Sequence, residues 1–181
     1  MEFGPNETQR LFERVVRNFL HDRLPMDELH RLARSGAGFD EPLWRGLVEL
    51  GLAGLLVPER FGGAGLGMFE AALAAETLGY YAAPAPFAAV AVMGPLAILQ
   101  SRDDAAQAQW LPRIASGTAR LAVVFERLAG VTGESAVERR GDRLSGRLHG
   151  GIDFGGATHV LAILKDGGLA VLPIGAAGVR V

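Results

Sequence analysis

The sequence predicts an α+β fold, with an N-terminal all-helical domain followed by a small antiparallel β domain. Up to about residue 118, apolar residues recur every three or four positions, which is the spacing of amphipathic helices. Beyond that point, short apolar runs alternate with glycine-rich turns, which is typical of strands. Because the two patterns are segregated along the chain, we expect two domains, covering residues 1–118 and 119–181.

The first helix has a signal at each end. Asn6 followed by Gln9 resembles a capping box, and Pro25 should stop the helix. A single apolar stripe is expected on this helix, formed by Leu11, Phe12, Val15, Val16, Phe19 and Leu20.

Two more helices should follow before residue 51. One covers residues 27–34 and ends at a glycine pair, and the next begins after Asp40 with Pro42 in its first turn. The buried positions expected on the latter are Trp44, Leu47, Val48 and Leu50.

Residues 51–79 form the most distinctive segment of the chain. Pro58 favours an extended chain around residues 55–57, and three glycines within residues 62–65 favour a tight turn. A helix over residues 66–78 should then end at Gly79. The glycine cluster matches neither common phosphate-loop pattern, so a packing turn is favoured over a phosphate cradle.

The remaining elements are read from shorter signals. After the linker 84–86, we expect an apolar helix over residues 87–99 and a polar one over 103–111, capped by Asp103. Candidate strands cover 120–126, 137–140, 144–148, 160–164 and 169–174, with turns at 140–143 and 165–168. So few short strands make a marginal sheet, and we expect another chain or further sequence to complete it.

Composition excludes several classes of function. A net charge of −2 gives no general attraction for nucleic acid, and no apolar run is long enough to cross a bilayer. Without cysteine there is no disulfide or thiolate metal site. His149 and His159 lack the spacing of metal ligands, and His21 and His30 lie on arginine-rich helix faces. We therefore expect no metal, no nucleic-acid partner, no membrane association and a cytoplasmic location.

Three stretches together resemble the acyl-CoA dehydrogenase family. The first is Val57-Pro58-Glu59, then Gly62-Gly63-Ala64-Gly65, then Glu76 and Gly79. The second is Gly94-Pro95-Leu96 with residues 109–117, and the third is Leu144-Ser145-Gly146 with Ala157. Each motif is weak alone, but their joint order and spacing are specific and span nearly the whole chain.

The resemblance implies α,β-dehydrogenation of an acyl-CoA thioester. In the family, a glutamate removes the α proton while FAD accepts a hydride from the β carbon. That glutamate lies in a C-terminal helical bundle which this chain does not contain, so no catalytic residue is assigned here.

The resemblance also implies where FAD would bind. One family strand falls on Ala122, Val124, Phe125 and Glu126, and a second element falls on Gly151 and Ile152. Here the threonine of the first strand is replaced by Phe125 and its aromatic residue by Ala122, and a usual Gly-Ser-Asp turn is at best residues 133–135. The second element lacks its tryptophan and threonine, so a flavin would lose stacking and hydrogen bonds.

Substrate contacts are expected on the helix over residues 87–99. Val90, Met93 and Leu96 occupy positions that would line an acyl pocket in the family. Small neighbours would leave room for a bulky acyl group, although core packing explains the same pattern equally well.

These departures lead to the hypothesis that the chain is the degenerate subunit of a heteromeric, steroid-type acyl-CoA dehydrogenase. A homologous partner would then supply the base and hold most of the FAD. Two alternatives stay open: a non-catalytic structural or regulatory module that has lost flavin binding, and a family member turned to another flavin reaction.

Overall fold

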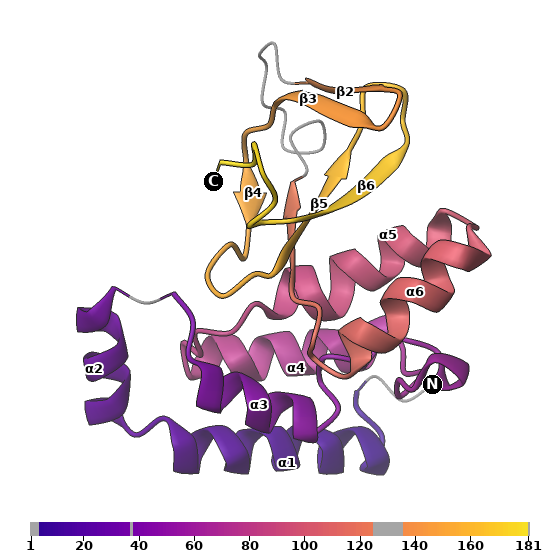
Figure 1. The fold of residues 1–181 in the computed structure, drawn as a ribbon. Coiled ribbons are helices and arrows are strands. Elements are labelled where there is room, and N and C mark those ends of the chain that lie inside the picture. The colour runs from indigo at the N-terminus through magenta and orange to yellow at the C-terminus, as the bar shows by residue number, and fades with distance from the viewer. Residues whose placement is uncertain (1–3, 37, 125–135, 181) are drawn as a thin grey trace.

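The computed structural model describes residues 4–36, 38–124 and 136–180. A layer of helices forms the base of the molecule, and a sheet stands on it with a two-stranded ladder at the far end (Figure 1). The expected order of helices followed by strands is therefore confirmed.

The first three helices are α1 (Glu7–Arg23), α2 (Met26–Ser35) and α3 (Glu41–Glu49). The capping box at α1 is confirmed, since the Asn6 side chain accepts from the Gln9 amide and the Gln9 side chain accepts from the Asn6 amide. Asp40 caps α3 by accepting from the Leu43 amide at 2.8 Å. On α3, Trp44 and Leu47 are buried, whereas Val48 and the following Leu50 are only partly buried.

The segment after α3 is a compact turn, so the expectation of an extended run at residues 55–57 is wrong. The Val57 amide donates to the Gly54 carbonyl, and the short 3₁₀ helix η1 (Glu59–Phe61) follows. The amides of Ala64, Gly65 and Leu66 donate back to carbonyls of residues 54–57 at 2.9 Å. Because these amides are already bonded within the chain, the glycine cluster is a packing turn and offers no phosphate cradle.

Helix α4 (Met68–Tyr80) differs from its prediction at both ends. It begins two residues later than expected, because Glu70 folds back to accept from the Gly67 amide at 3.0 Å. Gly79 does not stop it. The turn after the helix is made by Ala82, which has a positive φ of 48°.

The expected helix over residues 87–99 is two pieces, the π-helical η2 (Ala88–Met93) and α5 (Gly94–Gln100). The Gly94 amide bonds to the Ala89 carbonyl five residues back, and Pro95, which has no amide hydrogen, follows immediately. Helix α6 (Asp104–Ala115) comes next. Asp103 caps it as predicted, accepting from the amides of Ala105 and Ala106.

The described strands form two groups. The four-stranded sheet has the order β4 (Gly151–Ile152), β1 (Leu121–Val124), β5 (His159–Ile163), β6 (Leu169–Pro173). Separately, β2 (Ala136–Arg140) pairs with β3 (Arg143–Arg147).

One pairing departs from the antiparallel expectation. The two predicted hairpins, β2–β3 and β5–β6, are antiparallel, but β1 and β5 are parallel. More than thirty residues separate β1 from β5, including the β2–β3 ladder, and a connection of that length lets the chain return in the same direction.

Arg120 ties the sheet to the helical layer at the foot of β1. Its guanidinium donates to the Gly156 carbonyl, lies 5.0 Å from the centre of the Phe39 ring, and is 3.5 Å from the Glu41 carboxylate. The described part of the chain therefore has contacts between its helical and β parts that are polar as well as apolar.

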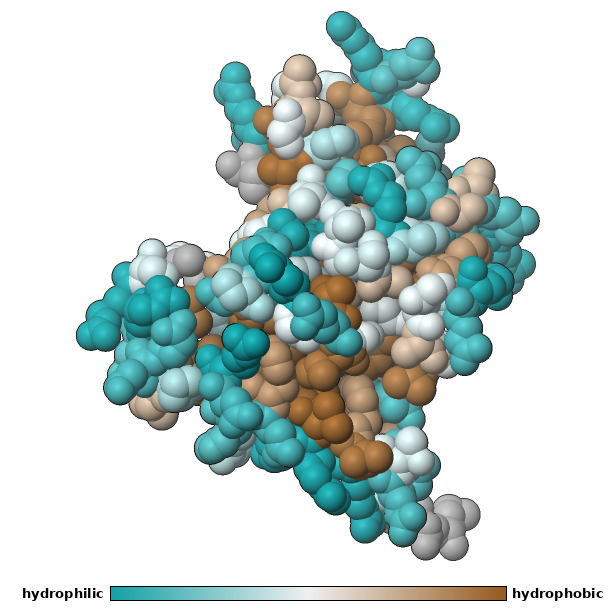
Figure 2. All heavy atoms as spheres, turned by 60° about the horizontal axis from the view of Figure 1, so that its bottom comes forward, coloured by the Kyte–Doolittle hydropathy of each residue, from teal (hydrophilic) through white to brown (hydrophobic). Residues whose placement is uncertain are grey.

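Large apolar side chains remain exposed on the helical layer. Figure 2 turns its underside forward and shows hydrophobic residues gathered between hydrophilic flanks. Leu11 and Val15 of α1, expected in the apolar stripe, are 56% and 44% exposed, and Met68 and Phe69 of α4 are also exposed. None of the helices in the described ranges is both long and apolar enough to cross a membrane.

Candidate functional site

The candidate site is the junction of β1, its neighbour β4 and the helical run η2, because most of the described residues expected to contact flavin and substrate lie on these elements. β1 and β4 are neighbours, with Val123 opposite Ile152 and Val124 opposite Gly151. The structure thus brings together two elements that lie almost thirty residues apart in the sequence.

The expected flavin residues divide between the two faces of the sheet. Leu121 and Val123 face the main core, and Ile152 packs on the same core. Ala122 and Val124 face the other way, into a small core with Val160 and Phe154. This division follows from the alternation of side chains along a strand.

The described residues at the expected flavin positions do not by themselves fit a flavin ring. Ala122 and Val124 are buried, and they have no hydrogen-bonding side chain. Gly151 has no room for a side chain, since a Cβ added there would collide with the Phe154 ring and come within 3.1 Å of Val124 Cγ2. Phe125, Glu126 and the turn at residues 133–135 lie outside the described residues.

The expected substrate residues lie on the helical side of the junction. Val90 is completely buried in the main core, whereas Met93 and Leu96 are partly buried against it. Helix and strand are in close contact here, because a Cβ at Gly94 would lie 2.8 Å from Leu121 Cδ1.

Asp153 joins the two sides of the junction and was not anticipated from the sequence. It follows β4 directly, and its Oδ2 accepts a hydrogen bond from the Ala89 amide at 2.8 Å. Burial raises the pKa of this carboxyl group, and the Ala89 hydrogen bond opposes that rise. Its φ of 60° is unusual for a residue other than glycine, although aspartate tolerates it better than most.

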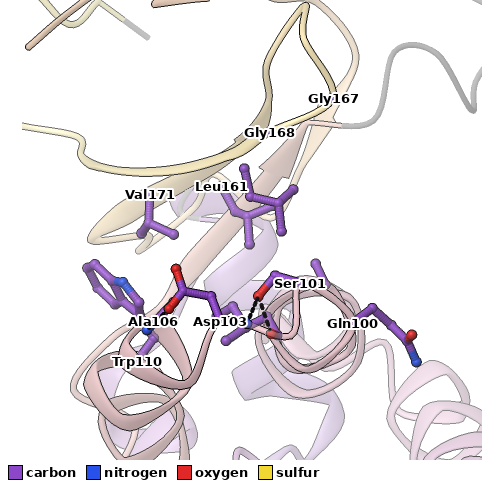
Figure 3. Close-up of a pocket in the computed structure, with 12 residues that line it drawn as sticks. Gln100, Ser101, Asp103, Ala106, Trp110, Leu161, Gly167, Gly168 and Val171 are labelled. Atoms are coloured by element: carbon purple, nitrogen blue, oxygen red, sulfur yellow. Dashed lines mark hydrogen bonds between the residues drawn. The ribbon is translucent and has the colours of Figure 1, made fainter. Parts of the chain in front are cut away.

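A cavity of about 540 Å³ lies beside the junction, between the sheet and helices α5 and α6. Leu161 and Val171 point from the sheet toward Trp110 and Asp103 on the helical side (Figure 3). Ala97 and Ile98 of α5 line it, but Val90, Met93 and Leu96 do not.

Two polar groups of this cavity are hydrogen-bonded within the chain. The Ser101 hydroxyl donates to the Ile98 carbonyl at 2.7 Å, and Asp103 Oδ1 caps α6. The Trp110 ring packs edge-on against the His159 ring, and the Arg113 guanidinium lies 4.6 Å from the centre of the Trp110 ring. Burial, with a smaller effect of Arg113, lowers the pKa of His159.

A second cavity, of about 530 Å³, lies on the opposite face of the sheet. Val124 and Gly151 line it together with Leu148, Phe154 and Arg180. Among the described residues, no group of three or more histidine or acidic side chains is arranged to hold a metal ion.

Comparison with known proteins identifies the family. The family model for the acyl-CoA dehydrogenase N-terminal domain matches residues 6–118. The chain belongs to the acyl-CoA dehydrogenase family. A curated relative, acyl-CoA dehydrogenase IpdE2 of Mycobacterium tuberculosis, is 32% identical over 123 residues, which is 67% of this chain and 38% of the relative.

Solved structures extend the match to the β part. The Tcur3481–Tcur3483 steroid ACAD G363A variant is 31% identical, with a TM-score of 0.80 over 95% of this chain and 49% of the matched chain. The ChsE4–ChsE5 complex from Mycobacterium tuberculosis is 26% identical, with a TM-score of 0.82 over 99% of this chain and 50% of the matched chain. The chain thus spans about half the length of these solved relatives.

Within this acyl-CoA dehydrogenase fold, sequence reasoning missed the groups that join distant segments. Asp153 and its partner Ala89 are 64 residues apart, and Arg120 contacts Phe39 and Gly156. A lone aspartate two residues before a pair of glycines signals a turn, but no local pattern indicates which distant amide its side chain will accept from.

Proposed function

We propose that this chain is a subunit of an FAD-dependent acyl-CoA dehydrogenase and acts with a homologous partner chain. It would contribute to α,β-dehydrogenation of an acyl-CoA thioester, while the partner carries the catalytic glutamate and holds most of the FAD. The observation that carries this proposal is the β1–β4 edge, whose described positions expected to contact flavin hold aliphatic side chains and a glycine with no room for a side chain.

Two of the solved relatives support a partnership, since both are named as pairs of chains, Tcur3481–Tcur3483 and ChsE4–ChsE5. The first of these is described as a steroid ACAD, which supports a steroid or other bulky acyl-CoA as substrate of the assembly proposed here. In such an assembly, Met93 and Leu96 would form part of the acyl wall, because both keep partly exposed apolar surface.

A second candidate function is a structural or regulatory module that keeps the fold for protein association alone. The same lack of hydrogen-bonding side chains at the described positions expected to contact flavin favours it. Exposed apolar side chains on α1 and α4 fit either proposal, since contiguous apolar surface is typical of interaction sites.

The two candidates differ in what accompanies the chain. A tagged chain expressed in its native source should recover a flavin-bearing homologue, and the complex should reduce an artificial electron acceptor when acyl-CoA is added. Recovery of a flavin-free assembly without this activity would support the structural module instead. The homologue purified without the chain is the matched control.

A further inference from the structure

Asp153 completes a set of contacts that links three segments at the junction, namely β1, β4 and η2. β4 pairs with β1, β1 lies against η2, and the Asp153 carboxylate returns from the end of β4 to the Ala89 amide in the first turn of η2. Each of the three segments is thereby held by the other two.

The carboxylate satisfies an amide that the helical run leaves open. At the start of a helix, the first amides have no carbonyl partner within it, and a carboxylate oxygen is a strong acceptor for them. Asp153 reaches this amide from another part of the chain, at the cost of a left-handed backbone conformation. Because the residue is partly buried, water competes poorly for the same amide.

We propose that Asp153 is a positioning residue that fixes the first turn of η2 to the end of β4. The helical face that carries Val90 and Met93 is then held in register with the β1–β4 edge. Its role toward acyl-CoA rests on the proposed function, whereas the coupling of the two segments does not.

Hydrogen exchange of the backbone amides in the purified full chain tests the coupling directly. Asp153→Gly removes the carboxylate and accommodates the positive φ, while Asp153→Asn keeps an acceptor oxygen. We expect Asp153→Gly to accelerate exchange at residues 88–93 by about tenfold or more, and Asp153→Asn to change it little.

Asp103→Ala is the matched control, because it removes a capping carboxylate from a different helix. It should accelerate exchange at Ala105 and Ala106 but leave residues 88–93 unchanged. Unchanged exchange at residues 88–93 in Asp153→Gly would overturn the proposal.

A second readout concerns the ligand and uses the complex with the homologous partner. Asp153→Gly should weaken binding of an acyl-CoA severalfold, and Asp153→Asn should restore it. Equal affinity for wild type and Asp153→Gly would overturn the positioning role. If the wild-type complex bound no acyl-CoA, the proposed function would fall, while the exchange measurement would still decide the coupling.

Discussion

At the scale of single residues, Asp153 is a carboxylic acid whose ionisation the fold opposes. Burial raises the pKa of Asp153 above its ordinary value of 3.8. An acid whose pKa is higher in the folded state than in the unfolded state stabilises the fold fully at pH values below its unfolded-state pKa. This stabilisation is lost as the pH rises through the folded-state pKa.

The first prediction follows from this loss of stability with rising pH. Asp153→Asn removes the titration but keeps an acceptor for the Ala89 amide, so the variant should gain stability relative to wild type as the pH rises from about 4 to 7. The gain should stay below about 1 kcal/mol, because solvent screens a half-exposed group. Urea unfolding of both proteins across this range measures it, and a difference that does not change with pH would refute the prediction.

Gly63 is a residue whose environment leaves no room for a side chain. An added Cβ would collide with the Val57 carbonyl oxygen and lie 2.6 Å from the Gly54 carbonyl oxygen. These are backbone atoms of the turn that also receives the amides of residues 64–66, so the turn cannot yield without breaking hydrogen bonds.

We therefore expect Gly63→Ala to lower the free energy of unfolding by about 1–3 kcal/mol or more. Gly79→Ala is the control, because Gly79 lies within α4 and an added Cβ meets nothing within 4 Å. Alanine is the better helix former, so this variant should be neutral or more stable by up to about 1 kcal/mol. Thermal and urea unfolding compare them, and equal stability of the two variants would contradict the packing-turn account.

At the scale of elements, Glu70 joins α4 to α1. One carboxylate oxygen accepts from the Gly67 amide, and the other accepts from the Gln9 side chain at 2.8 Å. Gln9 also belongs to the capping box of α1, so a single chain of hydrogen bonds covers the starts of both helices. The Gln9 hydrogen bond, followed by the backbone hydrogen bonds, lowers the pKa of Glu70.

Glu70→Ala should lower the free energy of unfolding by about 1 kcal/mol at neutral pH. Because the folded-state pKa is lowered, this contribution is present above the ordinary value of 4.5 and is lost as the pH falls through the folded value. Glu76→Ala, at an exposed position of the same helix, is the control and should have little effect. A loss for Glu70→Ala that persisted unchanged in acid would argue against an ionised capping group.

Elements with local end signals were predictable from the sequence, and others were not. Asn6, Asp40 and Asp103 each mark a helix start that the structure confirms, because a cap is a contact between residues three or fewer apart. Gly79 failed as a stop signal, since the rest of α4 packs well enough to carry the helix one residue beyond it.

At the scale of the whole molecule, the order of helices and strands was predictable, but the path between strands was not. The parallel pairing of β1 with β5 depends on a long connection whose route leaves no periodic signal. The expected flavin residues also divide between the two faces of the sheet. Ile152 packs on the main core, whereas Ala122 and Val124 face the opposite side, because side chains alternate along a strand.

The family assignment rests on the match of residues 6–118 to the family's N-terminal domain, while the proposal of a partner chain rests on the junction of β1, β4 and η2. The aliphatic residues at the described positions expected to contact flavin are the ground for the proposal that a second chain carries out most of the chemistry. The partner, the cofactor and the substrate therefore have to be tested together with this chain.

The most direct test is the FAD content of the purified chain, measured from its flavin absorbance with and without the homologous partner. The chain alone should bind little FAD, even after incubation with excess cofactor, and show no acyl-CoA dehydrogenase activity. The complex should contain FAD and be active. Stoichiometric FAD and dehydrogenase activity in the chain alone would contradict the proposed partnership.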